Sequence, residues 1–211
     1  DTTVNSSPTD ISGKGNHGAF VGGASYSAAD KAFTFDGTNE MIYTNSASSL
    51  PTGDAIYSMS AWIKHEGTPS SGTHPVVFGF GSAWASDKLA IINLRDGNKL
   101  GSDIGSSSLC STDAVITQNQ WHHVVICKVG TGLLTTDTIR LYIDGVEITD
   151  KQLNNAARTQ SLDTSIYVSV GAGFNSQTSP TSPFTGKVSN PKIYNVALEP
   201  SEVRKLYNLG R

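Results

Sequence analysis

Two adjacent histidines, His122 and His123, follow Trp121 in the segment QWHHVVICKVG, and histidines can bind a metal ion or exchange protons. The residues after them are mostly apolar and β-branched, which indicates a strand. Neighbouring strand side chains point to opposite faces, so a ligand pair needs an i, i+2 spacing. The pair is therefore predicted to be structural: one histidine packs against the sheet or a loop, and the other is solvated or on the open sheet face. Trp121 is predicted to pack in the core.

A carboxylate pair is the next chemistry to consider, because glycoside hydrolysis needs two carboxylates about 5–10 Å apart. Glu147 is alone on its predicted strand, and Glu199 and Glu202 begin a predicted helix, where acidic residues suit the helix dipole. The remaining glutamates are Glu40 and Glu66, and no pair stands in a catalytic pattern. The chain also lacks a Gly-x-Ser-x-Gly motif and a P-loop. The sequence predicts a protein that is not an enzyme.

Sugar binding needs an aromatic platform and a few polar groups, because a ring stacks on the C–H face of a sugar while amides and charges bind its hydroxyls. Trp84 is the leading platform, since its segment GSAWASDK is a loop of small residues that predicts exposure. The alternative is that Trp84 folds back as a lid on the core. Trp62 either lines an open concave sheet or is covered by a loop. The other candidate ligand-binding residues are Asn93 and Arg95, next to Asp96 at a strand end, and Arg140 and Tyr142, which share an outward pattern.

Calcium is the one cofactor that the residues suggest. Asp10, Asn16 and the carbonyl groups of residues 13–18 are hard oxygen ligands in a tight turn. The alternative is that Asp10 caps the turn by binding its own backbone, as aspartate commonly does. Asp36, before Gly37, is predicted to be a turn residue of the same kind.

Period-two alternation defines the elements that must position these residues. In YSMSAWIK, Met59, Ala61 and Ile63 share one face with Tyr57. Asp144-Gly145 joins two apolar runs and predicts a tight hairpin. The predicted strands are Ala32–Asp36, Met41–Tyr43, Ile56–His65, Pro75–Gly79, Lys88–Leu94, Gln120–Lys128, Thr138–Asp144, Val146–Thr149, Ser165–Gly171 and Phe184–Tyr194.

One helix is predicted in ALEPSEVRKLYNLG, with Pro200 in its first turn and Gly210 after its end. Val203, Leu206 and Tyr207 form its apolar stripe. Gly101–Ser111 and Asn175–Ser182 are predicted to be long surface loops. About ten strands and one terminal helix predict an all-β fold, a two-sheet antiparallel sandwich without βαβ units.

Composition limits the partners. The 211 residues carry a net charge of −3 and only 16% charged residues, which argues against nucleic acid and anionic membranes as the main partner. No run of 18 apolar residues predicts a membrane span. The Ser/Thr/Asn-rich composition is typical of extracellular and virion proteins. Cys110 and Cys127 either form a disulfide that closes a short loop or are two buried free thiols.

Several segments, in order along the chain, resemble the laminin G-like domain of the concanavalin A-like jelly-roll family. They are DISGKGNHGAF, AFTFDGTNEMI, YSMSAWIK, the WHHVV strand followed by LYIDGVEI, and the closing FTGKVSNPKIYNVALEPSEVRKLY. The resemblance implies a jelly-roll sandwich formed by residues 1–211 as one domain, excised from a longer chain. Members of this family include carbohydrate-binding modules, adhesion domains and domains of phage and large algal virus particles.

The same resemblance sets expectations for the site. Family members carry acidic residues where Ser189 and Asn190 stand here, which implies that one calcium ligand is lost. They also open with an apolar strand before the first turn, so another segment or subunit is expected to fill that gap beside Asp1. The β-glucanases of this fold carry Glu-x-Asp-x-x-Glu on one strand, and its lyases carry Arg, Gln-x-His and Tyr motifs; neither set is present.

We therefore expect a non-catalytic carbohydrate- or surface-binding module of an extracellular or virion protein. Its expected partner is a glycan or polysaccharide, bound without nucleic acid and without membrane insertion. The alternatives are a structural virion or fibre domain that contacts protein subunits of a larger assembly, and a glycoside hydrolase or lyase on the same fold.

Overall fold

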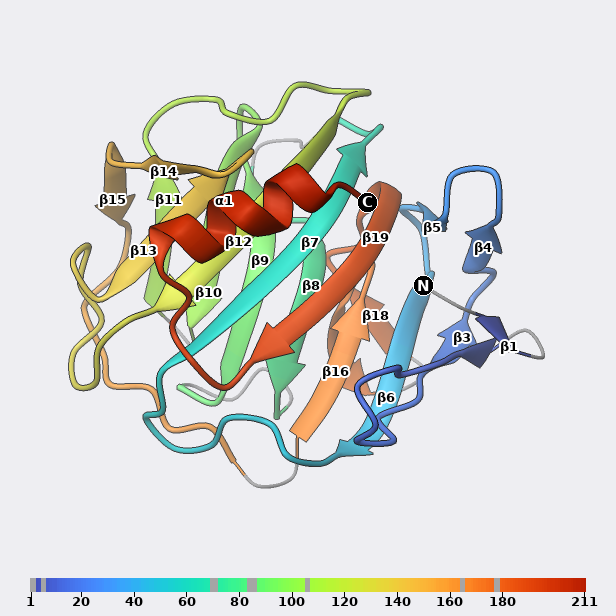
Figure 1. The fold of residues 1–211 in the computed structure, drawn as a ribbon, viewed down its shortest axis with the longest axis horizontal. Coiled ribbons are helices and arrows are strands. Elements are labelled where there is room, and N and C mark those ends of the chain that lie inside the picture. The colour runs from blue at the N-terminus through green and yellow to red at the C-terminus, as the bar shows by residue number, and fades with distance from the viewer. Residues whose placement is uncertain are drawn as a thin grey trace.

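The computed structural model describes residues 3–4, 7–68, 72–82, 87–104, 107–163, 166–176 and 179–211. Two antiparallel sheets stack face to face (Figure 1). One sheet has eight strands in the order β15-β11-β10-β9-β8-β16-β6-β3. Its strands are β3 (Ala19–Val21), β6 (Met41–Ala47), β8 (Val76–Gly81), β9 (Leu89–Arg95), β10 (Lys99–Ile104), β11 (Ser107–Ser111), β15 (Lys151–Leu153) and β16 (Ile166–Val170).

The second sheet has seven strands in the order β14-β13-β12-β7-β19-β5-β4. Its strands are β4 (Ser25–Ser27), β5 (Ala32–Asp36), β7 (Tyr57–His65), β12 (Trp121–Lys128), β13 (Ile139–Ile143), β14 (Val146–Ile148) and β19 (Thr185–Tyr194). Two small hairpins pair β1 (Thr3–Val4) with β2 (Ser7–Pro8) and β17 (Gly173–Ser176) with β18 (Ser179–Thr181). Every predicted strand overlaps an observed one, and the predicted two-sheet antiparallel sandwich is confirmed.

The core lies between the sheets and follows the predicted alternation. Met59, Ala61 and Ile63 of β7 pack in one cluster with the alternate residues Val124 and Ile126 of β12. From the other sheet, β8 contributes Phe78 and Phe80, and β9 contributes Ala90, Ile92 and Leu94. Each strand therefore buries one face in the core, as the period of two requires.

The hairpin between β13 and β14 has the predicted two-residue turn. Asp144 and Gly145 have positive φ angles of 49° and 80°, the backbone that a type I′ turn needs. Ile143 pairs directly with Val146 across the turn.

The terminal helix α1 (Pro200–Leu209) lies across the outer face of the seven-stranded sheet (Figure 1). Glu199 and Glu202 form a capping box, in which each side chain accepts a hydrogen bond from the backbone N–H of the other residue. Val203 is fully buried and joins Val125, Cys127 and other residues in a second cluster beneath the helix. Helix α1 therefore covers part of the outer face of the seven-stranded sheet, which would otherwise be exposed to solvent.

Two predicted loops are wrong because their residues form strands. Gly101–Ser111 contains most of β10 and all of β11, which pair from Gly101↔Cys110 to Ile104↔Ser107. Serine and glycine have little strand preference, so only the pairing with β9 and β15 makes this segment extended. Residues in Asn175–Ser182 belong to β17 and β18, which pair with each other.

The two cysteines are both buried free thiols. Cys110 lies in β11 of the eight-stranded sheet, whereas Cys127 lies in β12 of the other sheet. The disulfide alternative is therefore wrong: Cys127 packs in the cluster beneath α1, on the outer face of its sheet, whereas the Cys110 sulfur accepts a hydrogen bond from Asn154 in the other sheet region. Within the described parts of the chain, no helix has the length and apolar character that a membrane span requires.

The helix contact gives a stability prediction. Val203→Ala removes two buried carbon atoms and leaves a small void, so we expect the free energy of unfolding to fall by about 2 kcal/mol. Lys205→Ala, on the exposed side of α1, is the matched control and should change it by less than about 0.5 kcal/mol. Denaturant unfolding measures both. Equal effects of the two substitutions would contradict the packing of α1 on the sheet.

Candidate functional site

Both histidines of the opening pair have structural surroundings. The His122 Nε2 atom accepts the Thr117 N–H at 3.0 Å, so its Nδ1 carries the hydrogen and donates to Asp144 Oδ2 at 2.8 Å. The His123 ring lies on the opposite face, 5.2 Å from the Trp62 ring between centroids. The two residues are only 8% and 3% exposed, so the expectation that one of them is solvated or open is wrong.

Helix α1 covers the aromatic residues that were candidates for a sugar platform on the seven-stranded sheet. The Tyr207 ring stacks on Trp62 with centroids 5.6 Å apart. Tyr142 is 1% exposed, and its burial raises the pKa of its hydroxyl to about 12. Arg140, two residues before it, is half-buried near the carboxylates of Glu147 and Glu199. These residues stabilise the helix–sheet contact, and Tyr142 is closed to a ligand.

Trp121 is not in the core. It is half-buried, and the Arg211 guanidinium lies over its ring at 4.0 Å from the centroid. The prediction of a core tryptophan is wrong because the first residue of β12 lies at the edge of the layer, where the chain end folds over it.

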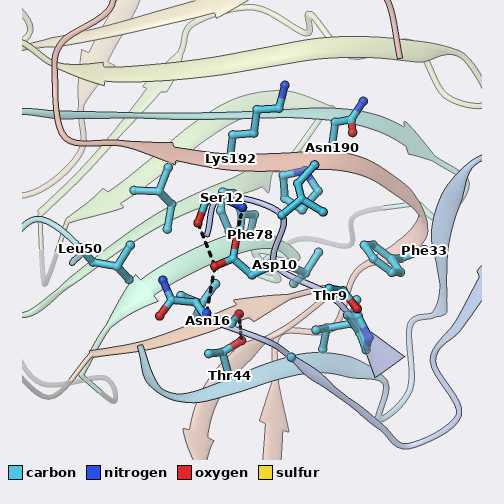
Figure 2. Close-up of a pocket in the computed structure, with 18 of the residues that line it drawn as sticks. Thr9, Asp10, Ser12, Asn16, Phe33, Thr44, Leu50, Phe78, Asn190 and Lys192 are labelled. Carbon is cyan, nitrogen blue, oxygen red and sulfur yellow. Dashed lines mark hydrogen bonds between the residues drawn. The ribbon is translucent and has the colours of Figure 1, made fainter. Parts of the chain in front are cut away.

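Asp10 and Asn16 come together in one turn, shown in Figure 2, but their polar groups have protein partners. The Asp10 carboxylate accepts hydrogen bonds from Ser12 N and Ser12 Oγ and, at 2.9 Å, from Asn16 N. Partial burial would raise the pKa of Asp10, but these hydrogen bonds hold it below its ordinary value. The Asn16 amide binds both backbone groups of Ser48. This geometry matches the turn-capping alternative.

Trp84 lies outside the described residues. The flanking strand ends, Gly81 of β8 and Leu89 of β9, pair with each other, while Asn93 pairs with Val76 at the other end of the same two strands. Asn93 and Arg95 therefore stand at the strand ends opposite those that flank the segment containing Trp84.

A polar cluster forms on the outer face of the eight-stranded sheet. Asn93 Nδ2 donates to Asp103 Oδ2 at 2.7 Å, and Arg95 Nη2 donates to Asp103 Oδ1. Arg95 Nη1 also lies 2.9 Å from the ring nitrogens of His74. We refer to His74, Asn93, Arg95 and Asp103 as the Arg95 cluster. It joins two predicted site residues to two that the sequence did not single out.

Burial controls the charges in this cluster. Desolvation raises the pKa of Asp103 even though Arg95 opposes the shift, and desolvation together with Arg95 lowers the pKa of His74. A neutral His74 can accept the Arg95 hydrogen bond. Gly101 lies opposite Asn93 on β10, where a Cβ atom would be 2.9 Å from Arg95 Cγ. Within the described structure, Asn93 Oδ1 and Arg95 Nε are buried without a hydrogen-bond partner.

A pocket of about 440 Å³, which we call the loop pocket, lies at the same end of the sandwich as the Arg95 cluster. It is lined by Gly37, His65, Gly67, Thr68, Gly72, Thr73, Pro75, Ser182, Pro183 and Thr185. Gly72, Thr73 and Pro75 line one side of this pocket, and His74, which stands between Thr73 and Pro75 in the chain, contacts Arg95. The contact between His74 and Arg95 therefore ties this side of the pocket to the Arg95 cluster.

Sequence reasoning missed Asp103, His74 and His65. Asp103 belongs to a segment that the sequence predicted to be a loop, so the pattern did not indicate that it pairs with β9. His74 and His65 are isolated in the sequence and carry no spacing signal. The one available signal was Gly101 beside Asp103, since glycine in a strand often marks a close approach of another group.

With this geometry established, comparisons with known proteins identify the class. The family model for the concanavalin A-like lectin/glucanases superfamily, in its laminin G-like form, matches residues 35–204. The chain belongs to this family of laminin G-like domains. A search of curated proteins gives no match.

Solved structures share the fold. Domain 4 of AbnA, a GH43 extracellular arabinanase from Geobacillus stearothermophilus solved with arabinotriose, is 24% identical with a TM-score of 0.64, over 94% of this chain and 92% of that domain. The binding domain of Paraclostridial Mosquitocidal Protein 1 is 18% identical with a TM-score of 0.67, over 95% of this chain and 49% of that one. Trypanosoma rangeli sialidase in complex with sialic acid is 15% identical with a TM-score of 0.67, over 98% of this chain and 31% of the sialidase. This chain thus spans about half of the mosquitocidal binding domain and about a third of the sialidase.

The environment of His123 gives a pH prediction. Burial lowers its pKa from 6.5 to about 4, so between these values the unfolded chain binds a proton that the folded protein does not. Stability must therefore fall as the pH drops through this window, by roughly 2–3 kcal/mol in total. His123→Phe keeps a ring against Trp62 and should remove that part of the acid sensitivity.

The measurement is denaturant unfolding of both proteins from pH 7 to pH 4. His65 and His74 also have lowered pKa values, so some acid sensitivity remains in the variant. Identical slopes of unfolding free energy against pH in the two proteins would contradict the assignment to His123.

Proposed function

We propose that residues 1–211 form a non-catalytic module that binds carbohydrate at the loop pocket. The observation that carries this proposal is the polar lining: Thr68, Thr73, Ser182 and Thr185 carry hydroxyl groups, and three further lining residues are glycines, which have no side chain to obstruct a ligand. Hydroxyls and backbone groups are the partners that sugar hydroxyls need. The volume of about 440 Å³ lies within the range of small-molecule sites, about 300–1,000 Å³.

The Arg95 cluster supports this site by positioning its wall. Arg95 and Asp103 are each 9% exposed, so most of their polar surface faces other protein groups. A buried and hydrogen-bonded ion pair fixes geometry, and here it holds His74 between the two pocket-lining residues Thr73 and Pro75. Arg95 and Asn93 are in this proposal positioning residues.

The absence of catalysis is also part of the proposal, and the glutamates support it. Each of them has a local structural partner. Glu40 accepts the Asp36 N–H, Glu66 pairs with Lys64, Glu147 lies near Lys151, and Glu199 and Glu202 cap α1. Carboxylates held in this way are poorly placed to flank a glycosidic bond.

The solved relatives support the ligand class. Two of them were solved with arabinotriose and with sialic acid, and these sugars are the first probes for this chain. The proposed setting is the surface of an extracellular protein or of a virion. Trp84 remains the proposed stacking platform of a separate site, because the strand ends that flank its segment are opposite those beside the pocket. Calcium at the Asp10 turn remains the proposed cofactor if binding needs a metal.

The test is binding of a broad glycan panel that includes arabinotriose and sialic acid, with calcium and with a chelator. Replacing both Thr68 and Thr185 by valine removes two hydroxyls and keeps their shape, so affinity should fall about tenfold. Thr149→Val, at an exposed position elsewhere, is the matched control and should bind as the parent does.

The panel also decides between the alternatives. No binding to any glycan by a folded protein would contradict the proposal and favour a structural virion or fibre domain whose partner is protein. Release of shorter sugars from bound oligosaccharides would contradict the non-catalytic part. Loss of binding in Trp84→Ala but not in the double threonine variant would move the site to the segment between β8 and β9 that contains Trp84.

A further inference from the structure

Apart from one histidine, the described lining of the loop pocket has no ionisable side chain. The lining comes from Gly37 at the end of β5, from the 65–75 segment between β7 and β8, and from residues 182–185. The end of β7 and the start of β19 pair with each other at the upper end of the sandwich in Figure 1. The segment GTPSSGT, residues 67–73, contains no acidic or basic residue. A charged ligand would therefore find no opposite charge on this lining.

Two histidines lie at the pocket, and the surroundings of each favour its neutral form. His65 is 1% exposed, and its Nδ1 atom lies 3.2 Å from the carbonyl oxygen of Thr185, which can only accept a hydrogen. Its Nε2 atom is buried without a partner among the described residues, so a proton there would have no acceptor. Burial lowers the pKa of His65, and burial together with Arg95 lowers the pKa of His74. At neutral pH neither histidine supplies a positive charge.

Three cations stand close to the lining, and each has a carboxylate partner. The pairs are Lys64 with Glu66, Arg95 with Asp103, and Lys187 with Asp30. The Arg95 guanidinium is also nearly buried, since the residue is only 9% exposed. Each of these positive charges is thus balanced inside the protein and leaves no uncompensated cation for an anionic ligand.

Two carboxylates without a cationic partner stand at the rim of the pocket. Asp36 pairs with the lining residue Thr185 across β5 and β19, and its Oδ1 atom accepts the Thr38 N–H at 2.8 Å. Asp96 Oδ2 accepts the N–H of the lining residue Gly72 at 3.3 Å. Both aspartates are exposed, and neither forms an ion pair within the part of the chain that the structure describes. The rim is therefore negative, while the lining is neutral.

We infer that the loop pocket selects neutral saccharides and rejects sugars that carry a carboxylate, with Asp36 and Asp96 as its specificity-determining residues. This inference rests on the proposed carbohydrate function of the same pocket. A carboxylate that enters the pocket loses part of its hydration and gains no paired cation, which is unfavourable. It also approaches two like charges, whose repulsion extends over about 30 Å at 10 mM salt. A neutral sugar meets neither penalty.

The inference separates the two sugars found with solved relatives. Arabinotriose has no ionisable group, whereas sialic acid carries a carboxylate. The chain should therefore prefer ligands of the first kind, although it shares its fold with the sialidase.

The test compares each sugar with a partner that differs from it only in charge. The pairs are arabinotriose with its derivative oxidised to a carboxylate at a terminal primary hydroxyl, trigalacturonic acid with its methyl ester, and sialic acid with its methyl ester. In calorimetric titrations at about 10 mM salt, the charged member of a pair should bind about fivefold more weakly or worse. The difference should shrink at about 150 mM salt, because the two rim carboxylates are exposed and salt screens them.

An arabinotriose derivative with an ammonium group at the oxidised position separates repulsion from loss of hydration. Loss of hydration weakens both charged derivatives, but only the carboxylate is repelled by the rim. The ammonium derivative should therefore bind more tightly than the carboxylate derivative.

Substitution of both rim residues tests their role directly. Asp36→Asn together with Asp96→Asn removes two charges and keeps the oxygens that accept the Thr38 and Gly72 N–H groups. The ratio of neutral to anionic affinity should fall by about threefold or more. Asp137→Asn is the control, because this exposed residue precedes β13 at the end of the sandwich where Lys128, the last residue of β12, pairs with the first residue of β13. It should leave the ratio as in the parent.

The outcomes distinguish this inference from the function on which it rests. Equal affinities within a pair, or tighter binding of the anionic member, would overturn the inference and leave carbohydrate binding in place. A ratio that the double aspartate variant does not change would also overturn it, because the rim charges would then have no part in the selection. Binding of no sugar in either form by the folded protein would contradict the proposed function and the inference together.

Discussion

The close packing of alternate side chains between two sheets is the constraint on which the rest of this structure depends. Met59, Ile63 and Val124 from one sheet meet Phe78, Phe80 and Ile92 from the other in a single buried cluster. Because the period of a strand is two, burying this face fixes what the other face carries. On the seven-stranded sheet that other face is aromatic and is covered by α1. On the eight-stranded sheet it carries the Arg95 cluster.

The outer faces show two ways of managing polar groups near the core. Beneath α1, Trp62 and Tyr142 combine large apolar surfaces with a polar group, and the helix shields them from water. On the opposite sheet, the charged Arg95 and Asp103 are nearly buried, so each needs the other. Removing one partner would leave an uncompensated charge, which costs far more than the pair contributes when it is intact. The cluster is therefore better understood as a device that fixes geometry than as a source of stability.

The two openings differ in chemistry because they arise differently. The loop pocket is formed where loops converge at the end of the sandwich, so hydroxyl and backbone groups line it. An inter-sheet cavity of about 390 Å³ opens between the Pro8–Gly18 segment and β19, and core side chains such as Ile42 and Phe78 line it. The lining of the first is thus mainly polar, and that of the second is mainly apolar. The laminin G-like family membership fixes the scaffold and leaves the choice of ligand to these local surfaces.

The sequence alone determined the features that depend on near neighbours in the chain. Alternation identified β7 and β12, Asp144-Gly145 fixed a tight hairpin, and Pro200 with the two glutamates fixed the start of α1. Only the tertiary structure decided the others, because long-range pairing created them. Serine-rich β11 became a strand because its neighbours β10 and β15 pair with it. Trp62 was covered by Tyr207, which lies 145 positions later in the chain. Asn93 and Arg95 were visible as candidates, but the contacts that they make depend on Asp103 across the sheet and on His74. Burial and pairing, which no local pattern encodes, decided the role of each of these side chains.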